Sequence, residues 1–406
     1  MNHERRVGIR WIAVAVLGLA VHSACNHPAK PVEGGTPGEP GTAVSAGSAC
    51  DLPTSTAGSH EELAWRLFVA ANCRTRTGQL TWETWTTQAC LNNPDDCTRK
   101  RLHGSVLAAA NAHTLTPDHP KRTGGCQSML TPSTADPSLK RFVPGNLSAK
   151  PVFCEEVTIN AAEKGYAQSN GLLTTTGQGT YLQSGKTITF PTGAVEVKAD
   201  WVPASSYQGV TMDCSKPNPT VYQELIDGTC YALTGIHLTS KLFPNWLWAT
   251  FEPQDPQTNP NRCRPDLYNA CNDPWGSAPA SSTGAATAVT PALAALFQAA
   301  GAAFPPSLQN YRLTGVQTEY SDPIASAGVL GSSFVEFNAN VPAGQASCIT
   351  CHSNALYNIT KAPNGVNPNG GPFPGGAAVG QPTPPPSADW KPLDFSWFLG
   401  FGVPTK

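Results

Sequence analysis

The stretch VEVKADW at residues 195–201 alternates apolar and polar side chains. This period of two predicts a β-strand whose apolar side chains all lie on one face. Residues 231–241 and 246–252 predict two neighbouring strands, because the turn residues Phe243-Pro244-Asn245 lie between them. Residues 311–320 predict a further strand. The middle of the chain, from about residue 150 to 320, is therefore expected to form a β-rich body.

Helix signals lie on both sides of these strands. Ser59 and Glu62 have the spacing of a capping box, and apolar residues recur every four positions at 63, 67 and 71. Thr290 followed by Pro291 predicts a second helix that runs to about Ala303. Together the signals predict an α+β fold, with an antiparallel β-rich body and short helices.

The N-terminus has the pattern of an export signal. Three arginines precede an apolar run at residues 11–21, and the small residues Ser23 and Ala24 follow it. The run is shorter than the about 20 residues that a membrane-spanning helix needs. We therefore predict a signal peptide at residues 1–24. Cys25 occupies the position of a lipid-modified cysteine, although His22 departs from the lipoprotein pattern and simple cleavage nearby remains the alternative.

Residues 25–58 are rich in proline, glycine, serine and threonine, which predicts a flexible tether. The tether would join a lipid anchor to a single α+β domain at residues 59–406. The formal net charge is −2, so the composition gives no sign of a nucleic-acid partner.

Thirteen cysteines are an odd number for an exported chain. Lipid attachment would use Cys25, and the motif described next would use Cys348 and Cys351. Ten cysteines then remain, enough for five disulfides in an oxidising compartment. The simplest pairings join sequence neighbours: Cys90 with Cys97, Cys214 with Cys230, and Cys263 with Cys271.

The stretch CITCH at residues 348–352 contains a C-x-x-C-H motif. At this spacing the thiols of Cys348 and Cys351 can each add to one haem vinyl group, and His352 can bind the iron as proximal ligand. The motif predicts one covalent haem c, in a haem-attachment segment at about residues 321–406. A thioredoxin-like dithiol is a weaker hypothesis, because a glycine- and proline-rich tail follows the motif in place of a βαβ unit. A structural disulfide is weaker still, because a bridge across two residues is strained and uncommon.

The sixth iron ligand is not evident from the sequence. The 54 residues after His352 contain no methionine, histidine or cysteine. We select His237, which lies within a predicted strand, although an ordinary core or surface histidine is the more usual interpretation. The other upstream candidates are Met129, Met212, His27, His60, His103, His113 and His119.

Charged residues within the predicted strands form a second, weaker pattern. They could flank haem propionates or a substrate, but more often such residues form the solvated face of a half-buried sheet. The sequence has no nucleophile elbow, phosphate-binding loop or dinucleotide fingerprint. The residues concerned are Glu196, Lys198, Lys241, Glu252 and Glu319.

Several segments between residues 60 and 400 resemble a family of uncharacterised bacterial exported cytochrome c-like proteins. The resemblance implies a single haem c domain and leaves the reaction open; the high cysteine content departs from it. The segments are FVAAN (68–72), WETW (82–85), FPTGAVEVKA (190–199), HLTSK (237–241), WATFE (248–252), NYRL (310–313) and SCITCH (347–352).

These observations favour an exported protein with one c-type haem and a role in electron transfer. A haem-dependent oxidoreductase of peroxidase or oxidase type is the first alternative, and a haem-based binding or sensing lipoprotein is the second. We expect a redox protein or a small molecule as partner, and a lipid anchor as the contact with a membrane. The expected location is the periplasm or the outer membrane.

Overall fold

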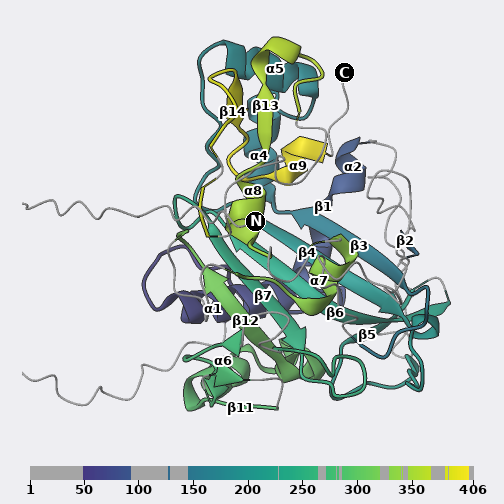
Figure 1. The fold of residues 1–406 in the computed structure, drawn as a ribbon. Helices are drawn as coiled ribbons and strands as arrows, with labels where there is room; N and C mark the ends of the chain where they lie inside the picture. The colour runs from purple at the N-terminus through teal and green to yellow at the C-terminus, as the bar shows by residue number, and fades with distance from the viewer. Residues whose placement is uncertain are drawn as a thin grey trace, which may run out of the picture. The chain divides into compact units, whose positions relative to one another are not determined.

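The stretch at residues 195–201 forms β4 (Val195–Pro203), which lies inside an eight-stranded antiparallel sheet. In this computed structural model the main path of the sheet runs β1-β3-β4-β6-β7-β12, with β2 paired to β3 and β5 paired to β6 (Figure 1). The sheet and its short helices confirm the α+β class. The other strands of the sheet are β1 (Thr86–Thr87), β2 (Gln127–Ser128), β3 (Val152–Ile159), β5 (Gln223–Ile226), β6 (Thr229–Ser240), β7 (Leu247–Pro253) and β12 (Tyr311–Gln317).

The structure describes residues 49–92, 127–128, 145–226, 228–263, 271–279, 281–282, 286–320, 329–339, 341, 346–366, 380–382 and 384–401. All of them belong to one compact unit, residues 43–406. The predicted signal peptide and Cys25 lie outside the described residues. Within the described part of the chain, no helix has the length and apolar character needed to cross a membrane.

One face of the sheet is apolar and packs against α1 (His60–Asn72) and α6 (Pro291–Ala300). Phe68 of α1 stacks on Phe251 of β7, with 4.2 Å between the ring centroids. The alternate residues of β4 from Val195 to Trp201 enter the same core, as their period of two predicts. Burial of this apolar face is the main stabilising contribution of the body.

Both predicted helix starts are confirmed. The side chain of Ser59 accepts a hydrogen bond from Glu62 N at 3.1 Å, and that of Thr290 accepts one from Leu293 N at 3.2 Å. The second helix ends as an α-helix at Ala300, before the predicted end at residue 303. Gly301 takes a left-handed φ of 56° there, and the chain tightens into one 3₁₀ turn.

The opposite face of the sheet carries polar side chains and is covered by α7 (Ser333–Ala339). A Cβ on Gly235 of β6 would lie 3.0 Å from Val335 Cγ2, so this glycine lets the helix approach the sheet. The prediction that this face is solvated is wrong. Glu196 and Glu252 are 8% and 1% exposed, because the later part of the chain folds back over the strands.

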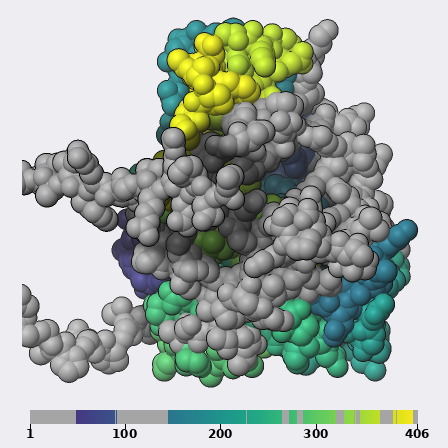
Figure 2. All heavy atoms as spheres, in the orientation of Figure 1, coloured from purple at the N-terminus to yellow at the C-terminus, as the bar shows by residue number. Residues whose placement is uncertain are grey.

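That later part builds a second core with two helices from the middle of the chain, α4 (Ala161–Ser169) and α5 (Thr175–Gln183). It contributes β13 (Leu356–Asn358), paired antiparallel with β14 (Trp390–Pro392), and α9 (Trp397–Phe401). Figure 2 shows the yellow C-terminal residues beside the teal residues of the α4–α5 region. The helix α8 (Cys348–His352) also belongs to this core, through the fully buried Ile349.

The folded region begins earlier than predicted. Ala49 is buried and Cys50 is disulfide-bonded to Cys73, so residues 49–58 are fastened to the body instead of extending the tether. Residues 25–48 of the predicted tether lie outside the described residues.

Two predicted disulfides, Cys214–Cys230 and Cys263–Cys271, are confirmed. Cys90 and Cys154 are disulfide-bonded as well. The predicted Cys90–Cys97 pair involves a residue outside the described part of the chain. The remaining short α-helix and strands are α2 (Gln88–Asn92), β8 (Cys271–Asn272), β9 (Ser277–Ala278), β10 (Ser281–Ser282) and β11 (Ala288–Val289).

Candidate functional site

The C-x-x-C-H motif is a single turn of helix, α8, that begins after Ser347. Ser347 Oγ accepts a hydrogen bond from Thr350 N at 3.4 Å, and the Ser347 carbonyl accepts one from Cys351 N at 2.8 Å. Cys348 and Cys351 are three residues apart, so both lie on one side of this turn. Both remain thiols, whereas every other cysteine in the described ranges is disulfide-bonded.

His352 is oriented by a backbone carbonyl. Its Nδ1 lies 2.8 Å from Phe395 O, and its ring lies 4.5 Å from that of Trp248, centroid to centroid. A carbonyl oxygen only accepts hydrogen bonds, so Nδ1 must carry the proton and donate it. The neutral ring therefore has its free lone pair on Nε2. This tautomer is the one that a histidine needs to bind a metal through Nε2.

The carbonyl that orients His352 is itself held by a buried ion pair. Asp394 and Phe395 both take left-handed backbone angles, with φ of 52° and 66°. Lys241 Nζ donates to Asp394 Oδ1 at 2.6 Å, and Phe190 N donates to Asp394 Oδ2 at 2.7 Å. The side chains of Lys241 and Asp394 are 7% and 8% exposed. These contacts fix the strained segment that presents the Phe395 carbonyl.

The site holds its two histidines neutral. Burial lowers the pKa of His352 to about 4, against the effect of the bond to Phe395 O, and the positive charge of Lys198 lowers it further. Burial also lowers the pKa of His237 to about 3, with Lys198 acting in the same direction. A neutral imidazole can bind a metal, whereas an imidazolium cannot.

His237 lies beside the first cysteine of the motif. Ligand atoms of His237, Glu336 and Cys348 all lie within 4.8 Å of one another, and His237 Nε2 is 3.6 Å from Glu336 Oε1. Burial raises the pKa of Glu336 to about 8, against the effect of the Ser332 N–H that donates to it. Burial, with the charge of Glu336, also raises the pKa of the Cys348 thiol well above its usual range.

The charged residues of the predicted strands lie mostly in pairs or clusters on this covered face. Lys198 Nζ is 2.8 Å from Glu155 Oε2, and Glu155, Asp200 and Glu336 raise the pKa of Lys198 against the effect of its burial. Glu196 accepts a hydrogen bond from Ser396 and lies against Glu163, and burial raises the pKa of both carboxyls. Glu319 is the exception, an exposed residue that accepts a hydrogen bond from Asn245.

Two other candidates for the sixth iron ligand, His60 and Met212, lie within the part of the chain that the structure describes. His60 lies in α1, where its Nδ1 is 3.4 Å from Thr318 Oγ1 and its ring meets that of Phe243 edge-on. Met212 packs on a small cluster of buried side chains around Phe334 and Phe337. The candidates His27, His103, His113, His119 and Met129 lie outside the described residues.

Sequence reasoning missed three parts of this site. Glu336 lies in a short helix with no strong periodicity, and Trp248 was placed in a strand without a role. The Phe395 carbonyl belongs to the backbone, which no sequence motif identifies. A usable signal existed at Gly235, since a glycine inside a strand often marks the close approach of another segment.

Comparisons of this chain with protein-family models, with curated proteins and with solved structures found no match. The resemblance to exported cytochrome c-like proteins therefore stays a prediction from the sequence.

Proposed function

We propose that this protein is an exported c-type cytochrome-like protein that binds one haem covalently and transfers electrons. The thioethers would form at Cys348 and Cys351, and His352 would be the proximal iron ligand. The observation that carries the proposal is the combination of two thiols on one helical turn with a histidine whose Nδ1 donates to Phe395 O.

The residues of this site fit a haem. Metal-binding histidines usually donate their second ring nitrogen to a carbonyl or a carboxylate, which fixes the ring and the tautomer. His352 meets this requirement through Phe395 O, and the buried pair of Lys241 and Asp394 holds the segment that supplies the carbonyl. A haem attached here would supply one-electron chemistry between ferric and ferrous iron. The chain itself orients the ligand and keeps it neutral.

A dithiol–disulfide function is less well supported. Redox-active cysteines need an accessible thiolate, which requires a lowered pKa. Burial raises the pKa of the Cys348 thiol instead, which disfavours a thiolate in the folded chain.

The test is maturation of the chain in a bacterial host that attaches haem c. We expect a Soret absorbance band and a haem-stained band on a denaturing gel, because covalent haem survives denaturation. Cys348→Ser with Cys351→Ser should lose the stain. The matched control, Cys214→Ser with Cys230→Ser, removes a disulfide outside the motif and should keep it. Unstained wild-type protein would refute the proposal.

A haem-dependent oxidoreductase is the second candidate, and the polar cluster at Cys348 favours it. A neutral His237 beside Glu336 could accept or donate a proton next to the haem, or His237 could bind the iron as sixth ligand. A low-spin spectrum that does not respond to cyanide or peroxide would favour the carrier, and a high-spin, peroxide-reactive iron would favour the enzyme.

His237→Ala separates ligation from the other roles of this histidine. If His237 binds the iron, the variant should turn a low-spin spectrum into a high-spin one, while Met212→Leu should leave it unchanged. An unchanged spectrum in His237→Ala would exclude His237 as the sixth ligand.

We retain the lipid anchor at Cys25 and the periplasmic or outer-membrane location as parts of the proposal, testable by lipid labelling and by fractionation.

A further inference from the structure

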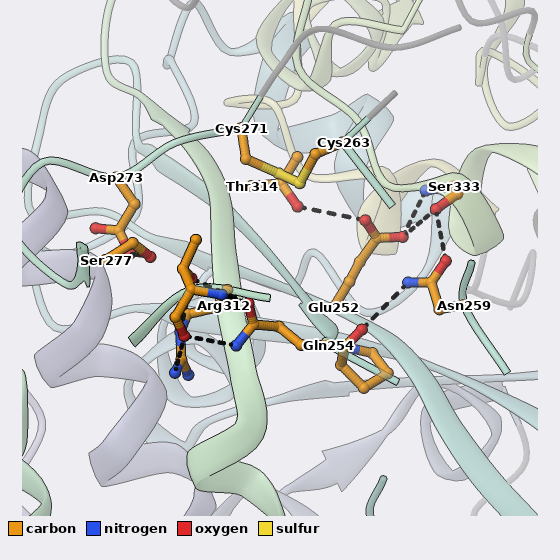
Figure 3. The surroundings of a disulfide bond; sticks show 12 residues. Glu252, Gln254, Asn259, Cys263, Cys271, Asp273, Ser277, Arg312, Thr314 and Ser333 are labelled. Carbon is orange, nitrogen blue, oxygen red and sulfur yellow. Dashed lines mark hydrogen bonds between the residues drawn. A yellow bond between two sulfur atoms is a disulfide. The ribbon is translucent and has the colours of Figure 1, made fainter. Parts of the chain in front are cut away.

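Two buried arginines close to the covered face differ in how their donors are used. Arg312 Nε, Nη1 and Nη2 all donate hydrogen bonds, to Thr287 Oγ1, to the carbonyls of Gln309 and Tyr311, and to the Thr287 carbonyl. Figure 3 shows Arg312 near Gln254, at one side of the Cys263–Cys271 disulfide. The guanidinium of Arg312 is thus bound on all sides by the fold, which is the usual state of a buried arginine.

Arg262 is buried to the same degree but lacks such partners. It is 2% exposed, and its Nε and Nη1 have no hydrogen-bond acceptor within the described part of the chain. A buried donor without an acceptor is destabilising, and more so when the group is charged. Arg262 remains a cation at neutral pH, since burial lowers its pKa only to about 10.

The acidic side chains whose charge acts on Arg262 use their oxygens elsewhere. Glu252 accepts hydrogen bonds from Ser333 N, from Ser333 Oγ and from Thr314 Oγ1 (Figure 3). Asp273 accepts from Trp65 Nε1 at 3.0 Å and from Ser277 Oγ at 2.9 Å. Both carboxylates offset the charge of Arg262 without supplying acceptors to its Nε and Nη1.

The charge of Glu252 acts on Arg262, and Glu252 in turn links it to the proposed haem site. Glu252 binds the first residue of α7, Ser333, and Glu336 of the same helix lies at Cys348. The three residues from Ser333 to Glu336 span roughly 5 Å along a helix axis. A haem attached at Cys348 and Cys351 would carry its two propionates on the pyrrole rings that do not bear the thioethers. Such a carboxylate is the type of acceptor that a guanidinium binds in bidentate fashion.

We propose that Arg262 is the anchor of a carboxylate-binding site on the covered face of the sheet. The carboxylate is either a propionate of the attached haem or that of a free small carboxylic acid. The first source rests on the proposed haem attachment, and the second does not.

The experiment compares wild type, Arg262→Met and Arg262→Lys as matured protein, with Arg312→Met as the matched control. Two measurements are made on each: the propionate bending bands in resonance Raman spectra, and the melting temperature in sodium acetate or sodium succinate against sodium chloride at equal ionic strength. Arg262→Lys keeps the positive charge and loses the paired donors of the guanidinium. It therefore remains informative if Arg262→Met fails to fold.

A haem propionate at Arg262 predicts that the Raman bands shift in both Arg262 variants and that carboxylates do not raise the melting temperature. A free carboxylate predicts that the melting temperature of wild type rises with acetate or succinate. The apparent Kd should then increase at least about tenfold in Arg262→Lys, because a bidentate pair is lost. Arg312→Met should lower the melting temperature in every buffer. Arg262→Met should not lower the melting temperature when no carboxylate is bound.

Unchanged Raman bands together with no carboxylate-dependent stabilisation of wild type would overturn the proposal, whatever the haem content. Absence of a Soret band would refute the haem proposal alone, because the carboxylate titration can still be read on protein without haem.

Discussion

The two faces of the central sheet are buried in different ways. On one face, Phe68 and Phe251 pack in a core of apolar side chains under α1 and α6. On the other face, Lys198 pairs with Glu155, Glu252 is held by hydrogen bonds from Ser333, and the neutral His237 lies beside Glu336 of α7. The apolar face stabilises without directional contacts, whereas each group on the polar face depends on its partner. The candidate haem site lies on the second face.

The largest expected effect is on the apolar face. Phe251→Ala should lower the free energy of unfolding by about 3–5 kcal/mol, because it leaves a cavity under α1. Urea denaturation measures the loss. The visible spectrum of the folded matured protein should be unchanged, since Phe251 points away from His352. A changed haem spectrum would show that the two faces are not independent.

The buried ion pair on the polar face comes next. Lys241→Met should lower the free energy of unfolding by about 3 kcal/mol, because it leaves Asp394 buried without its partner. Unlike Phe251→Ala, it should also alter the spectrum, since Asp394 holds the segment whose carbonyl orients His352. The double variant Lys241→Met with Asp394→Leu removes both charges and should lose less stability than the single one. If the single and the double variant lose the same stability, the unpaired charge of Asp394 does not cause the destabilisation.

Glu336 gives the polar face a dependence on pH. Its pKa is about 8 in the folded protein and near 4.5 when unfolded, so the folded state binds more protons between these values. The stabilisation is complete below pH 4.5 and is lost as the pH rises through 8. Glu336→Gln resembles the protonated form, so it should be as stable as wild type at pH 5 and more stable by a few kcal/mol at pH 8.5. Denaturation curves at both pH values decide this. If the difference in free energy of unfolding between the two proteins is the same at both pH values, the pKa of Glu336 lies in the ordinary range.

The smallest effect concerns a helix cap that supports the apolar face. Ser59→Ala should cost about 1 kcal/mol, because Glu62 N at the first turn of α1 loses its acceptor. Ser59→Asp supplies a different acceptor and should restore most of the loss. If Ser59→Ala leaves the free energy of unfolding unchanged, the disulfide between Cys50 and Cys73 already fixes the start of α1.

The apolar face was predictable and the polar face was not. Alternation in β4 and the caps at Ser59 and Thr290 are local patterns, and the structure has them where the sequence places them. The same alternation predicted a solvated face, which is wrong because α7 and the C-terminal segment cover it. That cover depends on contacts between residues far apart in the chain, 81 positions for Glu252 with Ser333 and 153 for Lys241 with Asp394. Local patterns carry no information about such contacts.

The candidate site divides in the same way. The spacing of the motif at residues 348–352 predicts that Cys348, Cys351 and His352 act together, and the structure has the three within one helical turn; haem attachment to them stays a prediction. The placement of His237 in a strand was right, and its role as iron ligand stays a prediction. The surrounding Glu336, Trp248 and Phe395 come from three distant segments, so only the folded chain brings them together.

The intact mass of the matured protein under denaturing conditions tests the central claim most directly. We predict the mass of the processed polypeptide plus that of one haem, together with a Soret band that stays with the chain. A mass equal to that of the polypeptide alone, without visible absorbance, would contradict haem attachment at Cys348 and Cys351.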